Sequence, residues 1–215
     1  MKTTPPSILA MLAVALLPML VPAQDTAPAG RLRLHAIFDS DMVLQRDKPI
    51  NIWGWAAPGS AVQVQLGADK AEASADAGKG RWEVTFPARP ASAEPQTLTV
   101  TAGSVKVEMG NLVVGDVWVM YGQSNTAFPL GKISNRDTES AQANLPNLRL
   151  FSITTNEQAD PQEDIRREAI DTGGWVASTP EAALEFSAIG FVFGKQLQLS
   201  TGIPIGVIKN SRGGA

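Results

Sequence analysis

The fold is decided by residues 112–130, which read L-V-V-G-D-V-W-V-M-Y-G-Q-S-N-T-A-F-P-L. The segment opens with a hydrophobic run rich in β-branched side chains, and such a run ending in turn residues predicts a strand buried on both faces. Gly122 ends the run, and the polar Gln123, Ser124 and Asn125 follow it. A serine directly after a buried strand lies at the carboxyl edge of the sheet, where α/β folds bind ligands.

Ser124 is therefore a candidate nucleophile. If a helix or turn begins just after it, free backbone N–H groups point to the same place and can stabilise an oxyanion. The alternative is an ordinary turn or N-cap serine, because serine is common at both positions. The pattern differs from the G-x-S-x-G nucleophile elbow, since Thr126 stands where the second glycine would be. Spacing alone leaves both interpretations open.

The same segment strongly resembles the motif G-D-V-W-x-x-x-G-Q-S-N-M-x-x-P-L of the sialate O-acetylesterase family. Members of this family are SGNH-type carbohydrate esterases, and their nucleophile is the serine of G-Q-S-N. Residues 42–59 resemble the start of the family's leading β-domain, and residues 186–197 and 202–215 resemble its helix and second core strand. The resemblance runs from about residue 32 to the last residue.

The resemblance implies an acyl-transfer site without metal or cofactor. Ser124 would be the nucleophile, and the oxyanion hole would combine its backbone N–H with that of Gly213 or Gly214. The supporting turn would be formed by Gly122, Gln123 and Asn125. Without the resemblance, the glycine pair is equally consistent with a plain tight turn. The implied substrate is an O-acetylated carbohydrate.

The sequence departs from the family pattern in several places. Tyr121 replaces a small residue, Thr126 a methionine and Arg212 a tryptophan, which bears on substrate preference more than on reaction type. The family's general base comes from an Asp-x-x-His pair that this sequence lacks, and its only histidine, His35, is expected to be structural. A serine hydroxyl needs an adjacent base. We therefore expect an amino-terminal portion of a longer esterase that hydrolyses esters poorly by itself.

Composition excludes several classes of function. With 215 residues and 44% hydrophobic content, the chain can bury a core in one or two domains. Its net charge is −3, with no block of like charge, so nothing indicates binding to nucleic acid. The absence of cysteine excludes disulfides and thiol catalysis.

Residues 1–23 have the pattern of a secretory signal peptide. Lys2 provides the positive start, an apolar run follows, and small residues precede the cleavage point. We expect a secreted or periplasmic protein without stable membrane association after cleavage. The alternative is an uncleaved anchor, although Pro18 and the short apolar run disfavour a transmembrane helix.

The predicted fold class is mixed, with a small β-sandwich in residues 24–111 and an incomplete α/β SGNH-hydrolase domain with parallel strands in residues 112–215. Short runs with turn signals predict the sandwich strands at residues 32–37, 50–55, 61–66, 81–86, 97–102 and 105–109. The second domain is predicted to contain a strand at 148–153, a capped helix start at 178–181, a helix at 188–199 ending near Gly202, and a strand at 203–208. This order implies parallel strands and a right-handed crossover.

Two groups of side chains have a second interpretation. Trp53, Trp55 and Trp82 are assigned to packing, although a tryptophan platform could also bind sugars. That possibility gives the alternative function, a carbohydrate-binding module attached to a degenerate hydrolase domain; a non-functional fragment is a third. Three acidic residues are assigned to a solvated surface and not to a metal site: Glu163, Asp164 and Glu168.

Overall fold

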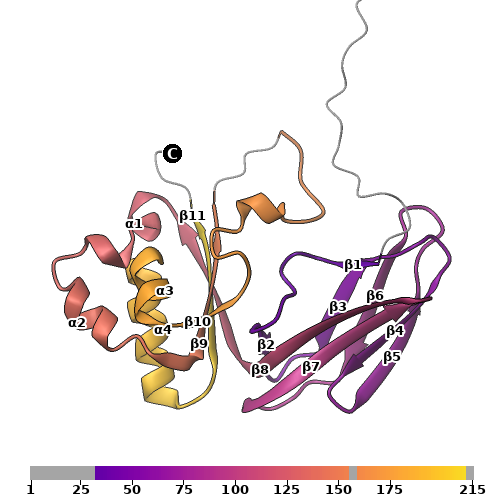
Figure 1. The fold of residues 1–215 in the computed structure, drawn as a ribbon, viewed down its shortest axis with the longest axis horizontal. Helices are drawn as coiled ribbons and strands as arrows, with labels where there is room; N and C mark the ends of the chain where they lie inside the picture. Colours follow the sequence, from indigo (N-terminus) through magenta and orange to yellow (C-terminus); the bar gives the residue numbers. More distant parts are fainter. Residues whose placement is uncertain (1–31, 155–158, 212–215) are drawn as a thin grey trace, which may run out of the picture.

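The computed structural model describes residues 32–154 and 159–211. One long strand, β8 (Val105–Gly122), runs through both halves of the molecule. Its first part pairs antiparallel with β7 (Ser92–Ala102), and its last part pairs in parallel with β11 (Ile205–Ser211). Figure 1 shows the β-rich half on one side of this strand and the helices on the other. The predicted boundary near residue 111 thus falls within a continuous strand.

Two sheets of the amino-terminal half enclose one core. The first has the order β1 (Arg33–Leu34), β3 (Ile50–Trp55), β6 (Arg81–Phe86). The second continues from β8 and β7 to β4 (Ala61–Leu66) and β5 (Asp69–Ser74). Buried and exposed residues alternate along β4 and β6 because one face of each strand packs inward. Ile52, Val64 and Trp82 belong to the shared hydrophobic cluster.

Most of the predicted strands in this half are confirmed. Strands β3, β4 and β6 have the predicted bounds, whereas the predicted strand at residues 32–37 is reduced to β1. The short strand β2 (Val43–Gln45), which pairs in parallel with residues 113–115 of β8, was not predicted. Strand β5 was not predicted either, because its polar sequence at the exposed edge of the sheet carries no hydrophobic alternation.

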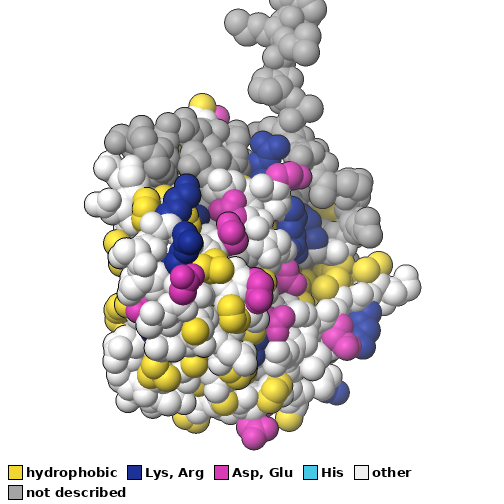
Figure 2. Space-filling view, turned by 60° about the vertical axis from the view of Figure 1, so that its left-hand side comes forward, with side chains coloured by type: hydrophobic (Ala, Val, Ile, Leu, Met, Phe, Trp, Pro, Cys, Tyr) yellow, Lys and Arg dark blue, Asp and Glu magenta, His cyan; other side chains and the backbone are white. Residues whose placement is uncertain are grey.

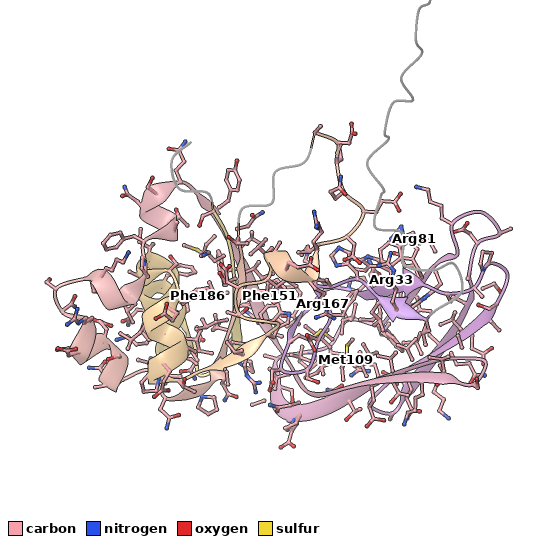
Figure 3. The ribbon with its side chains drawn as sticks, turned by 45° about the horizontal axis from the view of Figure 1, so that its top comes forward. Arg33, Arg81, Met109, Phe151, Arg167 and Phe186 are labelled. Atoms are coloured by element: carbon pink, nitrogen blue, oxygen red, sulfur yellow. The ribbon has the colours of Figure 1, made fainter. Side chains whose placement is uncertain are left out.

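The carboxyl-terminal half contains the predicted parallel strands. β11 lies between β8 and β9 (Leu145–Ile153) and is parallel to both, while β10 (Val176–Ser178) adds an antiparallel edge. The helical elements are α1 (Ser124–Ala127), η1 (Leu130–Lys132), α2 (Arg136–Ala141), η2 (Arg167–Ala169), α3 (Pro180–Glu185) and α4 (Ala188–Thr201). Figure 1 shows α1 to α4 on one face of the parallel strands. Figure 3 shows Phe186 on this helical side of the strands and Phe151 nearer the β-rich half.

The predicted helix ends are confirmed. The Thr179 side chain accepts a hydrogen bond from the Ala182 N–H at 3.2 Å, and Pro180 opens α3. α4 ends at Gly202, whose φ of 70° lies in the left-handed region that favours glycine. Local sequence signals therefore determine where both helices begin or end.

The prediction that the central strand is buried on both faces is wrong for the second half of β8. Trp118, Val119 and Tyr121 are 45%, 61% and 85% exposed. Pairing with β2 stops at Gly115, and no other described strand pairs with that edge of β8 beyond it. Trp118 still contacts Phe193 of α4, with ring centroids 5.2 Å apart. The second half of β8 is therefore an edge strand whose apolar side chains are only partly covered.

The assignment of Asp164 to a solvated surface is also wrong. Its carboxylate forms an ion pair with Arg33 and accepts a hydrogen bond from the Ala36 N–H at 2.8 Å. Asp164 thus ties the segment before η2 to the β-rich half, at a junction where Figure 3 labels Arg33 and Arg81. Glu163 and Glu168 are exposed as predicted. Within residues 32–154 and 159–211, no group of three His, Cys, Asp or Glu residues could hold a metal ion.

Candidate active site

Ser124 lies at the carboxyl edge of the parallel strands. It is the first residue of α1, which follows β8 with only Gln123 between them, and it is exposed. Because β8 and β11 are parallel, their carboxyl ends meet at the same edge of the sheet. α1 packs against both strands at this edge, as Figure 1 shows. Ser124 is therefore accessible from solvent at this edge of the sheet.

The turn before α1 needs a glycine at residue 122. A Cβ added to Gly122 would lie 2.3 Å from Thr126 Oγ1, because α1 folds back over the end of β8. The Ala127 N–H donates to the Gln123 carbonyl at 3.0 Å and closes the turn. The side chains of Gln123 and Asn125 are exposed. The described contacts thus give Gly122 and the backbone of Gln123 a supporting role, whereas the role of the Asn125 side chain stays a prediction.

Strand β11 ends directly beside this turn. Ser211, its last residue, is opposite Gly122 in the parallel register. Arg212, Gly213 and Gly214 lie outside the described residues, so the proposed glycine of the oxyanion hole stays a prediction. Ser211 was not among the predicted site residues, although it stands immediately before the Arg-Gly-Gly segment.

The only histidine belongs to the other half of the molecule. The Ile37 N–H donates to His35 Nδ1 at 3.1 Å, which leaves the proton on Nε2, 3.4 Å from Asp164 Oδ1. Burial lowers the pKa of His35 below its ordinary value, against the opposing effect of the Asp164 carboxylate. Its ring also packs against Trp53, with centroids 5.3 Å apart. These contacts agree with the predicted structural role and give His35 no role beside Ser124.

A second polar cluster lies on the helix-facing side of the sheet. Lys209 of β11 is opposite Ser152 of β9, and its Nζ lies 3.3 Å from Asp171 Oδ2. The Ser152 hydroxyl donates to the same carboxylate oxygen at 2.9 Å. A cavity of about 210 Å³ adjoins the cluster, lined by Ser152, Asp171, Thr172, Val176, Ala182, Glu185 and Phe186. This cluster was not predicted, although Lys209 directly follows an apolar run in the sequence.

Charges of both signs are mixed on the helical face of the molecule (Figure 2). Figure 2 shows acidic and basic side chains next to one another on the helical side, and not gathered by sign. No helix in the described part of the chain is long and apolar enough to cross a membrane. The predicted signal peptide, residues 1–23, lies outside the described residues.

Comparison with known proteins agrees with this architecture. No protein-family model matches the chain. The sialate O-acetylesterases of Homo sapiens and Pongo abelii are each 30% identical to it over 92% of its length, and that of Mus musculus is 28% identical over 91%. The crystal structure of a carbohydrate acetylesterase from Xanthomonas citri superposes on 85% of the chain with a TM-score of 0.79 and 36% sequence identity.

The relatives are much longer than this chain. The match covers 40% of the human protein and 41% of the Xanthomonas citri chain. The chain thus spans about two fifths of the length of the proteins it matches, and the part it spans includes the strand, turn and short helix around Ser124.

Proposed function

This chain is a relative of the sialate O-acetylesterases, and we propose that it carries the nucleophile of an esterase that removes O-acetyl groups from carbohydrates. One observation supports this proposal above the others. Ser124, the serine of G-Q-S-N, is exposed where the parallel strands β8 and β11 end side by side. This edge of an α/β sheet is where ligands usually bind.

The proposed reaction is acyl transfer through a covalent intermediate. Ser124 Oγ forms a bond to the acetyl carbonyl carbon, its proton passes to a base, and the bond between that carbon and the sugar oxygen breaks. The sugar oxygen takes up a proton, and water then cleaves the acyl-enzyme to release acetate. The oxyanion would be stabilised by the Ser124 backbone N–H and by that of Gly213 or Gly214.

We propose that the general base comes from polypeptide beyond this sequence. The only histidine of the chain, His35, is held by Asp164 and the Ile37 N–H in the β-rich half. The exposed side chains at the end of β8 support the same view, because parallel sheets are normally covered on both faces. Val119 and Tyr121 would fit beneath a further strand and helix. The chain alone would then be a poor catalyst.

We further propose a domain architecture and a cellular location for this protein. The two sheets around Ile52 and Val64 would form a β-sandwich, and the half that begins near residue 112 would be an SGNH-hydrolase domain. The pattern of residues 1–23 supports export to the periplasm or the cell exterior. The substrate class, O-acetylated carbohydrate, is that of the Xanthomonas citri and mammalian relatives as their names give it.

The alternative of a carbohydrate-binding module finds little support. Trp55 and Trp82 are 8% and 2% exposed, so neither presents a ring face to solvent. Trp55 is instead stacked under the Arg33 guanidinium, 3.6 Å from its ring centroid. The burial of Trp55 and Trp82 supports packing within the β-rich half as their role.

Acetate release tests the proposal. The purified chain would be incubated with O-acetylated sialic acid and with p-nitrophenyl acetate, with and without imidazole as an external base. We expect turnover far below the roughly 1 s⁻¹ of a slow ordinary enzyme, stimulation by imidazole, and loss of the stimulated rate in Ser124→Ala. Turnover at an ordinary enzymatic rate that depends on Ser124 would refute the proposal that the general base lies outside this chain. A stimulated rate unchanged by Ser124→Ala would refute the nucleophile.

A further inference from the structure

A buried serine hydroxyl that has no hydrogen-bond partner among the described residues lies opposite the turn that bears Ser124. Ser211 is 9% exposed, and its Oγ has no hydrogen-bond partner among the described residues. Burying a hydroxyl without a hydrogen bond costs free energy, so native structures rarely do so without a compensating function. The three other buried serines of this half all have a partner: Ser178 donates to the Ala143 carbonyl at 2.7 Å, Ser152 donates to Asp171, and Ser187 Oγ accepts from the Gly190 N–H at 3.1 Å.

The register directs the Ser211 side chain toward the helices. Ile205 and Val207 of β11 belong to the hydrophobic cluster formed with α3 and α4. Because side chains alternate along a strand, Ser211 points to the same face. On β8, Trp118 contacts Phe193 of α4, so Gly122 also faces the helices. Ser211 and Gly122 are therefore neighbours on one face of the sheet, with strands about 5 Å apart.

The turn that bears Ser124 covers this pair. Thr126 Oγ1 occupies the space directly above Gly122, since a Cβ there would lie 2.3 Å from it. α1 packs against the end of β11 as well as β8. The Ser211 side chain thus faces α1 from the strand position opposite Gly122, and Ser124 is two residues before Thr126 on the same short helix.

We propose that Ser211 is a positioning residue for Ser124, whose hydroxyl donates a hydrogen bond to Thr126 Oγ1 when the serine attacks an acyl group. This inference rests on the proposed function. The hydrogen bond would hold α1 against the sheet as Ser124 Oγ moves toward the carbonyl carbon. Small displacements of a nucleophile change rates strongly, so one such bond affects catalysis more than the stability of the resting protein. The absence of a partner in the resting structure is the expected consequence.

The test measures the reaction of Ser124 and the stability of the fold separately. The purified chain would react with a fluorophosphonate in imidazole buffer, with the rate of adduct formation followed by intact-protein mass spectrometry and Tm by calorimetry. We expect Ser211→Ala to react about tenfold more slowly, the effect of one hydrogen bond, with an unchanged or higher Tm. Thr126→Val, which keeps the shape but loses the acceptor, should react equally slowly, and the double variant no more slowly.

Ser178→Ala is the matched control. It removes a buried serine hydroxyl that has a partner, so it should lower Tm and leave the rate unchanged. Ser211→Thr should restore the rate, because it restores the hydroxyl. An unchanged rate in Ser211→Ala, a loss of Tm like that of Ser178→Ala, or additive rates in the double variant would each overturn the inference. Absence of any Ser124 adduct on the unchanged chain would instead refute the proposed function and, with it, this inference.

Discussion

Gly122 lies directly under Thr126. A Cβ added to Gly122 would stand 2.3 Å from Thr126 Oγ1 and 3.2 Å from Thr126 Cβ, so rotating the threonine side chain cannot fully clear the space. The strand that leads to Ser124 and the helix that carries it are therefore packed as closely as a backbone without a side chain allows. Ser124 is two residues before Thr126 on this helix, so we expect the contact to influence where Ser124 lies.

Replacing Gly122 by alanine should displace α1. We expect Gly122→Ala to lower the free energy of unfolding by about 1–3 kcal/mol, the usual cost of overpacking, and to slow the reaction of Ser124 with a fluorophosphonate. Gly110→Ala on the same strand is the control, because nothing lies within 4 Å of its added Cβ. Equal effects of the two substitutions in urea unfolding would contradict this account of the turn.

His35 should make stability depend on pH. Burial lowers its folded pKa below 6.5, although Asp164 opposes the shift while Arg33 and Arg81 add to it. The unfolded chain therefore binds a proton at higher pH than the folded protein does. The contribution of His35 is fully present above pH 6.5 and is lost as pH falls from 6.5 toward the folded pKa.

The measurement compares urea unfolding of the wild-type chain and His35→Gln at about pH 7.5 and about pH 5.5, on either side of the ordinary histidine pKa. We expect the wild-type chain to lose more stability on acidification than the variant does, because glutamine does not titrate. A greater loss in His35→Gln would mean that the protonated imidazole is stabilised by Asp164.

Removing one partner of the buried ion pair between Lys195 and Glu139 should destabilise the fold more than removing both partners. Lys195 of α4 is 6% exposed. Its Nζ forms the ion pair with Glu139 and also donates a hydrogen bond to Gln142 Oε1 at 3.2 Å. Glu139→Leu leaves a buried ammonium without its carboxylate and should cost about 3–5 kcal/mol. The double variant Lys195→Met, Glu139→Leu should recover most of this loss in thermal unfolding. A double variant no more stable than the single one would contradict the prediction.

Two valines of β8 should respond differently to truncation. Val113 is 1% exposed between β2 and β7, whereas Val119 is 61% exposed on the edge segment. We expect Val113→Ala to destabilise the chain by about 2 kcal/mol and Val119→Ala by less than about 0.5 kcal/mol. Equal losses in chemical unfolding would show that Val119 is covered in solution.

Local sequence patterns predicted many of the strands and helix ends of this fold. The features that could not be predicted depend on contacts between segments far apart in the sequence. Alternation in β4 and β6 and the caps at Thr179 and Gly202 act within a few residues, so the sequence shows them directly. The apolar run ending at Tyr121 predicted a strand but not its exposure, because exposure depends on which strands lie beside it. The polar edge strand β5 carries no hydrophobic pattern to detect.

The residues of the candidate site also differ in whether the sequence alone could identify them. Ser124 could be selected because its motif is contiguous, and its place at the strand edge follows from the strand before it. Ser211 could not be selected, since its proximity to Gly122 depends on the register of two strands almost ninety residues apart along the chain. The partnership of Asp164 with Arg33 escaped prediction for the same reason, as 131 residues separate them.

The site of acylation tests the central claim most directly. The chain would be treated with a fluorophosphonate in imidazole buffer, digested, and analysed by peptide mass spectrometry, with Ser124→Ala treated in parallel. We predict a single modified peptide, with the adduct on Ser124, and no adduct in the variant. An adduct on another serine, or an equal level of modification in Ser124→Ala, would contradict the assignment of Ser124 as the nucleophile.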